Sequence, residues 1–390
     1  MQRQIYLDNS ATTKICPEAL ARYNEDSLLT FGNPSSLHKM GFDAEKLIGA
    51  ARSEIISSLG ATGSSVIFTA SGSEANNLAI IGRALAKERY RRGAKIITTE
   101  GEHASVSSPL VRLEPLGLKV VKISTRGGRL DLEQLRREMT PDVILVTMML
   151  VNNETGATYD IPEVAKIMKS QSPEAVLHID ATQAYMKMPI LKNKIGADMI
   201  TVSSHKIEGP KGIGALVVDE RILKSKGLSP IVFGGGQEMG LRSGTENVPA
   251  ISAFGEAVRV ARAGFGERRE KLMALRSYLI EKLDTLPELS EISYVKPENP
   301  APHIVNISIP KIKSETMLHY LSSYGIYVSS GSACSSNSTG LSTALIAYGR
   351  TPAEADTSLR ISFSHRNEFW EIDELISVLI SGLDKLSRIK

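Results

Sequence analysis

Two residues in the middle of the chain, Asp180 and Lys206, follow apolar runs of the kind that form buried strands. Asp180 ends the run 176–180, and Lys206 lies just past a short apolar run around 201–203 and just before a glycine-rich turn at 209–214. A lysine amine can hold an aldehyde cofactor as a Schiff base, and a carboxylate can keep a pyridine nitrogen protonated. We therefore predict a pyridoxal phosphate site at these two residues. The alternative is a buried Asp and a solvated surface Lys.

A turn of small residues upstream has the composition of a phosphate site. A predicted strand at 66–69 runs into Ser71, Gly72, Ser73 and Glu74, which open a helix predicted to reach about residue 87. The free backbone N–H groups and the positive dipole end of such a helix suit a phosphate. The alternative is an ordinary helix start, capped by Ser71 or Ser73.

Polar residues also follow the other predicted strands. The alternation of strands and helices between residues 66 and 220 predicts a mostly parallel sheet with helices on both faces. Ligands bind such sheets beyond the carboxyl ends of the strands. Considered alone, a histidine such as His103 is more often structural, and Asn153 could hydrogen-bond a phenolic oxygen or equally form a turn. Several polar residues nevertheless share a position at or just beyond the carboxyl ends of the predicted strands, and this predicts that they form one site. These residues are Ser73, His103, Asn153, Asp180, Gln183, Ser203 and Lys206.

A cysteine lies in a long polar loop in the C-terminal part of the chain. Residues 329–340 are nearly all small and polar, and they include Cys334. We expect such a loop to be mobile. Free cysteine is usually buried, so a cysteine exposed on such a loop is unusual. We therefore interpret Cys334 as a reactive thiol whose thiolate needs a cationic partner. The alternative is a tolerated surface cysteine. Cys16 is interpreted as structural or incidental.

Length and composition narrow the class of protein. The 390 residues exceed the usual size of one hydrophobic core, so two domains are expected. A net charge of +3 without a basic block gives no indication of a nucleic-acid partner. The sequence shows neither a membrane-spanning run nor the apolar core of a signal peptide. With 2 cysteines and 7 scattered histidines we predict no metal site and no disulfide framework, which fits the cytoplasm.

The motifs taken together resemble those of one family. Segments 178–183, 203–212, 242–245 and 329–334 are similar, in this order, to the NifS/IscS-type cysteine desulfurases, and the resemblance extends from Tyr6 to about Ser364. It implies the α/β fold type I of pyridoxal phosphate-dependent, aminotransferase-like transferases. A large domain with a mostly parallel seven-stranded sheet would span residues 15–260. Residues 1–14 and 261–390 would form a smaller α+β domain, which carries the mobile cysteine loop 329–341.

The resemblance implies a role for each candidate residue. Lys206 would hold pyridoxal 5'-phosphate, Asp180 would pair with its ring nitrogen, and His103 would stack on the ring. Arg360 would clamp the substrate carboxylate, a task that suits a guanidinium, and Asn33 and Asn153 would assist it. The other cofactor contacts would be Gln183 and Asn153 at the ring oxygen and, at the phosphate, Gly72, Ser73, Ser203 and His205 with Thr245 of the partner subunit.

The implied reaction transfers the sulfur of L-cysteine to Cys334. L-Alanine would leave, and the persulfide would pass to an acceptor protein of iron–sulfur cluster assembly or tRNA thiolation. Lys206 would take the Cα proton, and His103 would shuttle a proton. One alternative is an aminotransferase or β-eliminating lyase, in which Cys334 is dispensable. Another is a sulfur-trafficking protein without catalysis, against which the presence of Lys206, Asp180 and Cys334 argues.

Overall fold

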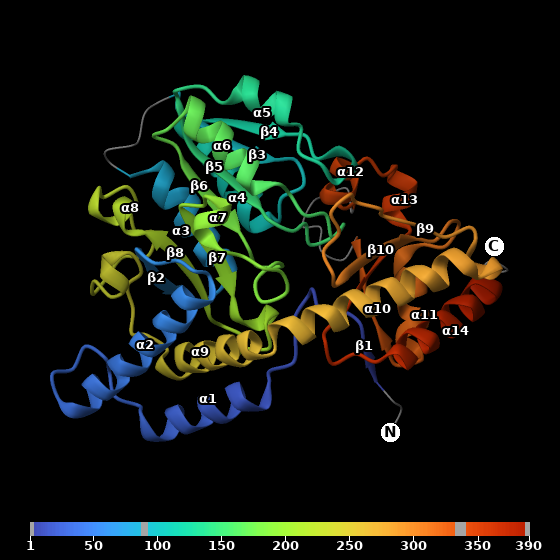
Figure 1. Ribbon diagram of the computed structural model, residues 1–390, viewed down its shortest axis with the longest axis horizontal. Coiled ribbons are helices and arrows are strands. Elements are labelled where there is room, and N and C mark those ends of the chain that lie inside the picture. Colours follow the sequence, from blue (N-terminus) through green and yellow to red (C-terminus); the bar gives the residue numbers. More distant parts are fainter. Residues whose placement is uncertain (1–3, 87–92, 332–340, 387–390) are drawn as a thin grey trace.

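The computed structural model describes residues 4–86, 93–331 and 341–386. Within these ranges the strands form a seven-stranded, a four-stranded and a two-stranded sheet. The seven-stranded sheet lies among the helices of the first two thirds of the chain, and the four-stranded sheet lies among the C-terminal helices (Figure 1). Cys334 and most of the predicted cysteine loop lie outside the described residues.

The large sheet is parallel except at one strand. β8 runs antiparallel to both of its neighbours, β2 and β7, whereas the other strand pairs are parallel. The prediction of a mostly parallel seven-stranded sheet is therefore confirmed. In spatial order the strands are β2 (Ser64–Thr69), β8 (Gly214–Asp219), β7 (Met199–Ser203), β6 (Val176–Asp180), β5 (Val143–Met149), β3 (Lys95–Thr99) and β4 (Lys119–Ile123).

Helices cover both faces of this sheet, as its apolar strands require. Successive side chains of a strand point to opposite faces. Ile96 accordingly packs in the cluster with α3 (Gly72–Ala84), α4 (Ala104–Leu113) and α8 (Glu220–Lys224). Ile97 packs in the cluster with α2 (Lys39–Ser58), α6 (Ile161–Gln171) and α9 (Val248–Ala263). Two shorter helices, α5 (Leu132–Glu138) and α7 (Lys192–Ile195), complete this part.

A second core surrounds the antiparallel four-stranded sheet. Its strands, in spatial order, are β12 (Ser329–Ser330), β13 (Ser358–Ser362), β10 (Ile304–Ser308) and β9 (Ser293–Tyr294). Its apolar cluster includes side chains of α10 (Phe265–Thr285), α11 (Ser314–Ser323) and α14 (Phe369–Leu386). The short helices α12 (Thr343–Tyr348) and α13 (Pro352–Asp356) precede β13.

The N-terminal segment joins this second core. β1 (Ile5–Tyr6) pairs in parallel with β11 (Ile326–Tyr327), and the side chains of Ile5 and Leu7 are buried in the same apolar cluster. The helical stretch after Asn247 breaks at Gly264, between α9 and α10. Figure 1 shows α10 running from α9 to the four-stranded sheet.

One long helix was not predicted. α1 (Pro17–Leu29) buries only Ala19 and Asp26, while Leu28 and Leu29 are exposed. Because the helix covers no continuous apolar face in this chain, its sequence lacks the periodicity by which amphipathic helices are found. No helix in the described part of the chain is long and apolar enough to cross a membrane.

Candidate active site

A cavity of about 320 Å³ lies at the carboxyl ends of β5, β6 and β7. Asn33 and Thr245, by contrast, are exposed and do not line it. Cys334, the predicted nucleophile, lies outside the described residues. The cavity brings together the other predicted residues, which are Gly72, Ser73, His103, Asn153, Asp180, Gln183, Ser203, His205, Lys206 and Arg360.

The N-terminus of α3 forms one end of the cavity. Ser71 caps the helix, and its Oγ accepts a hydrogen bond from the Glu74 N–H at 3.1 Å. A side chain at Gly72 would meet the Ser203 Cβ at 3.2 Å, so only glycine leaves this approach open. The Ser203 Oγ is buried and has no hydrogen-bond partner among the described residues. A buried hydroxyl without a partner, beside free helix N–H groups, fits a phosphate group.

Asp180 is held at the end of β6 by two donors. Its Oδ2 accepts from Asn76 Nδ2 at 2.7 Å, and its Oδ1 accepts from the Thr182 N–H at 2.9 Å. The same Asn76 amide donates to Ser105 Oγ at 2.8 Å. Asn76 was not predicted, although it lies four residues after Gly72 and therefore on the same helical face. The carboxylate is thus fixed before any ligand reaches it.

Lys206 lies on a single 3₁₀ turn, Ser204–Lys206, directly after β7. Its Nζ donates to the carbonyls of Ser10 and Ala11, the latter at 2.7 Å. Gln183 Nε2 donates to the Ser10 carbonyl at 2.9 Å. The segment after β1 therefore holds two of the predicted cofactor residues from one side of the cavity.

His103 caps α4 with its ring. Its Nδ1 accepts from the Ser105 N–H at 3.1 Å. Burial is the main cause that lowers the pKa of His103, and the charges of Lys206 and Arg360 lower it further against the opposing effect of Asp180. The ring is therefore neutral at pH 7, with Nδ1 as the acceptor and the proton on Nε2.

His205 is neutral for the same reason. Burial, followed by the positive charge of Lys206, lowers its pKa to about 4. Its Nδ1 lies 3.1 Å from Thr12 Oγ1, which orients the ring at the cavity wall. A neutral imidazole can donate one hydrogen bond to an anion without a change in its own charge.

Arg360 reaches the cavity from the middle of β13 in the four-stranded sheet, and only 2% of it is exposed. Its Nη1 donates to the Asn153 carbonyl at 3.1 Å and lies 3.5 Å from Glu154 Oε1. Its Nη2 donates to Asp8 Oδ1 at 3.0 Å and to Ser329 Oγ at 2.9 Å. The motifs of the sequence left Asp8 and Glu154 without an assigned role.

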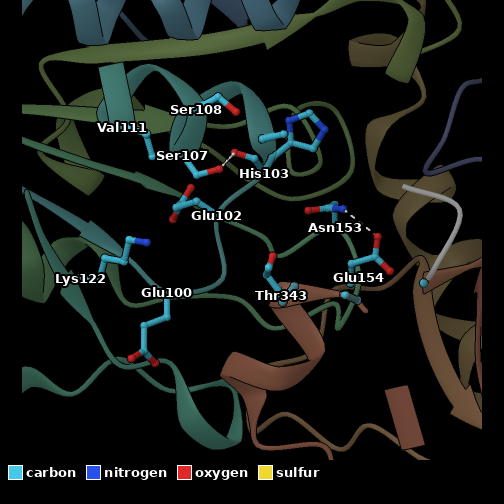
Figure 2. Close-up of a pocket in the computed structure, with 14 residues that line it drawn as sticks. Glu100, Glu102, His103, Ser107, Ser108, Val111, Lys122, Asn153, Glu154 and Thr343 are labelled. Carbon is cyan, nitrogen blue, oxygen red and sulfur yellow. Dashed lines mark hydrogen bonds between the residues drawn. The ribbon is translucent and has the colours of Figure 1, made fainter. Parts of the chain in front are cut away.

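A second cavity of about 250 Å³ adjoins the first. His103, Asn153 and Glu154 line it (Figure 2), and Gly331 and Ser342 line it as well. Gly331 and Ser342 are close in sequence to the two ends of the undescribed segment 332–340.

Comparison with known proteins identifies the family. Residues 5–375 match the model of the aminotransferase class-V family. The chain is 37% identical to a NifS/IcsS protein homolog of Lactobacillus delbrueckii subsp. bulgaricus, over 99% of this chain and 98% of that protein. It is also 37% identical to cysteine desulfurase IscS 1 of Archaeoglobus fulgidus, over 98% of this chain and 97% of that one.

A solved structure supports the same assignment. A NifS-like protein superposes with a TM-score of 0.89 at 31% identity, and the match covers 98% of this chain and 100% of the other. The chain therefore belongs to the aminotransferase class-V family, a family of pyridoxal phosphate-dependent enzymes, and within it to the NifS/IscS-type cysteine desulfurases.

Proposed function

We propose that the protein is a cysteine desulfurase that uses pyridoxal 5'-phosphate to remove the sulfur of L-cysteine. One observation carries the proposal: Asp180 and Lys206 line one cavity together with the unpartnered Ser203 hydroxyl at the N-terminus of α3. The family supports it, because relatives over nearly the full length are named cysteine desulfurases. The bound cofactor supplies an electron sink for the substrate carbons, which no side chain can supply.

The residues of the cavity divide into three groups by what they would hold. Lys206 would bind the cofactor aldehyde and Asp180 would pair with the ring nitrogen, while the neutral His103 would lie against the ring. Gln183 and Asn153 would donate to the ring oxygen. The phosphate would take its hydrogen bonds from Gly72, Ser73, Ser203 and His205, with Thr245 of the partner subunit.

Proton transfer would rest on Lys206 and His103. Once the substrate amine has displaced it, the Lys206 amine can take the Cα proton. His103, which is neutral at pH 7, can carry a proton between the substrate and the neighbouring cavity that it also lines. Arg360 would bind the substrate carboxylate through its two Nη atoms. Asn153 would assist Arg360, and so would Asn33.

The sulfur transfer balances without an external oxidant. The Cys334 thiolate attacks the substrate sulfur, the bond between that sulfur and Cβ breaks, and a proton replaces the sulfur on the carbon. One L-cysteine and one thiol thereby become one L-alanine and one persulfide. The persulfide sulfur would then pass to an acceptor protein of iron–sulfur cluster assembly or tRNA thiolation.

A homodimer would complete each site. Asn33 and Thr245 are exposed and lie away from the cavity of their own chain. Large apolar side chains that precede or follow them in sequence are also exposed, namely Leu28, Leu29, Phe31, Leu37, Phe42 and Phe233. Exposed apolar side chains in such number are typical of a protein interface. We place this interface over the two segments, with Thr245 entering the site of the partner subunit.

The test measures L-alanine and sulfide released from L-cysteine in the presence of a thiol reductant. We expect activity in the wild type and near-complete loss in Cys334→Ala, with the yellow colour of the bound cofactor unchanged. Cys16→Ala, which changes a buried cysteine outside the cavity, is the matched control and should stay active.

Three results would contradict the proposal. Equal activity in Cys334→Ala and the wild type would favour a β-eliminating lyase. The cofactor assignment would be refuted if the wild type stayed colourless after addition of pyridoxal phosphate. It would also be refuted if the Lys206→Ala variant kept the yellow colour of the wild type.

A further inference from the structure

Two carboxylates surround the guanidinium of Arg360. Asp8 Oδ1 lies 3.0 Å from Nη2, and Glu154 Oε1 lies 3.5 Å from Nη1. The side chain of Glu154 is only 6% exposed and that of Asp8 is 17% exposed. One positive charge is therefore already shared by two acidic groups before a substrate carboxylate arrives.

Glu154 contacts Arg360 and Asn153, two of the residues that the proposed function assigns to the substrate carboxylate. Its Oε1 accepts from Asn153 Nδ2 at 3.2 Å, as the dashed line in Figure 2 marks, and is the same atom that pairs with Arg360. Its Oε2 is buried and has no hydrogen-bond partner among the described residues. One oxygen thus orients the two binding side chains, and the other is available to carry a proton.

The charges make Glu154 the group that responds to an arriving anion. A third buried carboxylate beside one guanidinium is unfavourable unless one negative charge is removed. Burial raises the pKa of Glu154, and Asp8 raises it further, while Arg360 opposes both. Asp8 is better compensated, because Ser329 Oγ donates to it at 2.7 Å in addition to Arg360.

Other ionisable groups face Glu154 across the neighbouring cavity. They are Glu100, Glu102, His103 and Lys122, which line that cavity with it. None of their side chains makes a hydrogen bond or ion pair to Glu154 among the contacts of the described residues. The direct partners of its carboxylate are therefore Arg360 and Asn153.

We propose that Glu154 is a proton-linked positioning residue, which holds Arg360 and Asn153 toward the cavity and takes up a proton when a ligand carboxylate binds Arg360. The proposal rests on the proposed function, since it takes Arg360 as the carboxylate site. Uptake of the proton leaves Oε1 as the acceptor for both side chains. It also removes one of the two negative charges beside Arg360, which strengthens the attraction between Arg360 and the ligand carboxylate.

The experiment is titration calorimetry of the cofactor-loaded enzyme with L-alanine, in buffers of different ionisation enthalpy, which counts the protons bound. L-Alaninol, which has the amine but not the carboxylate, is the matched ligand. We expect L-alanine to take up as much as about one proton more than L-alaninol in the wild type. The affinity for L-alanine divided by the affinity for L-alaninol should also fall, by up to about tenfold for each pH unit above the pKa of Glu154.

Two variants separate Glu154 from the other acids. In Glu154→Gln, which keeps an oxygen for Arg360 and Asn153, the extra proton should vanish and the affinity ratio should no longer change with pH. Glu100→Gln removes an exposed carboxylate from the neighbouring cavity and should behave like the wild type.

The wild type alone can refute the inference, whether or not the variants fold. Equal proton uptake with L-alanine and L-alaninol means that no group titrates with the carboxylate. If the wild type also releases L-alanine from L-cysteine, this result refutes the role of Glu154 and leaves the proposed function intact. An extra proton that persists in Glu154→Gln likewise refutes it.

Discussion

Asp180 and Lys206 are held in place by residues that the motif analysis left without a role. Asn76 and the Thr182 N–H fix the carboxylate, and the carbonyls of Ser10 and Ala11 accept from the amine. Such contacts determine the direction in which each side chain points, and a displacement of about 1 Å can cost a large part of the activity. The supporting residues should therefore affect the cofactor nearly as much as the residues that touch it.

We predict that Asn76→Ala weakens cofactor binding. The variant removes a 2.7 Å hydrogen bond to a carboxylate, and bonds of this type contribute about 1.5–3 kcal/mol. The dissociation constant of pyridoxal phosphate should rise by roughly tenfold or more. Absorbance of the bound cofactor after dialysis against increasing amounts of free cofactor measures this constant.

Asn193→Ala serves as the control, because Asn193 is exposed and lies outside the cavity. If both variants bind the cofactor as tightly as the wild type does, Asn76 has no part in positioning Asp180.

At the scale of elements, three neighbouring strands carry the site. β5, β6 and β7 are buried along their whole length, and their carboxyl ends deliver Asn153, Asp180 and Lys206. His178 joins them in the interior of the sheet: its ring lies 2.8 Å from Thr147 Oγ1 on β5 and 3.0 Å from Thr201 Oγ1 on β7. Burial lowers the pKa of His178 to about 4.

Because the pKa of His178 is lowered in the folded chain, we predict that the protein loses stability in acid. The unfolded chain takes up a proton at His178 below about pH 6.5, whereas the folded chain does so only near pH 4, so the stability present above pH 6.5 is lost as the pH falls toward 4. The loss amounts to about 3 kcal/mol at most, at 1.36 kcal/mol for each unit of pKa. Urea unfolding at several values of pH measures it.

In His178→Gln the decline between pH 6.5 and 4 should be smaller, because this proton is absent. His319→Gln, at an exposed position on α11, should decline as the wild type does. If the stability of the wild type and of both variants declined in parallel as the pH fell, His178 would not couple folding to protonation.

At the scale of the whole molecule, the cavity draws on both sheets. Lys206 follows β7 of the seven-stranded sheet, whereas Arg360 extends from β13 of the four-stranded sheet. The proposed dimer adds Thr245 from a second chain. The proposed site is then complete only when both parts of one chain and one segment of another are assembled.

The dimer can be tested by mixing two inactive variants. Lys206→Ala removes the cofactor lysine, and Thr245→Asp places a negative charge where the phosphate would bind. If Thr245 serves the site of the partner subunit, a mixed dimer has one intact site, and random exchange of subunits should restore about a quarter of the wild-type activity.

Activity of the unmixed variants is the baseline for this measurement. A mixture with no more activity than its components would mean that Thr245 acts within its own chain or has no role. The domain boundary near residue 260 and the cytoplasmic location stay predictions.

The local pattern of the sequence was sufficient for the large sheet and for one edge of the site. Apolar runs alternate with helices, and polar residues follow several of the runs, so the fold class and the shared position of Asn153, Asp180 and Lys206 follow from neighbours in the chain. These features depend on a few consecutive residues, which is why their spacing predicts them.

The surroundings of Arg360 were decided by the tertiary structure. Its partner Asp8 is 352 positions away in the sequence and Glu154 is 206 positions away. Their meeting depends on how the N-terminal segment and the two sheets pack, and no local pattern encodes that packing. The same holds for α1, whose exposed leucines gave no amphipathic signal. The sequence by itself therefore determined the family, the fold class and the strand-end residues, and only the folded chain placed two carboxylates around one arginine.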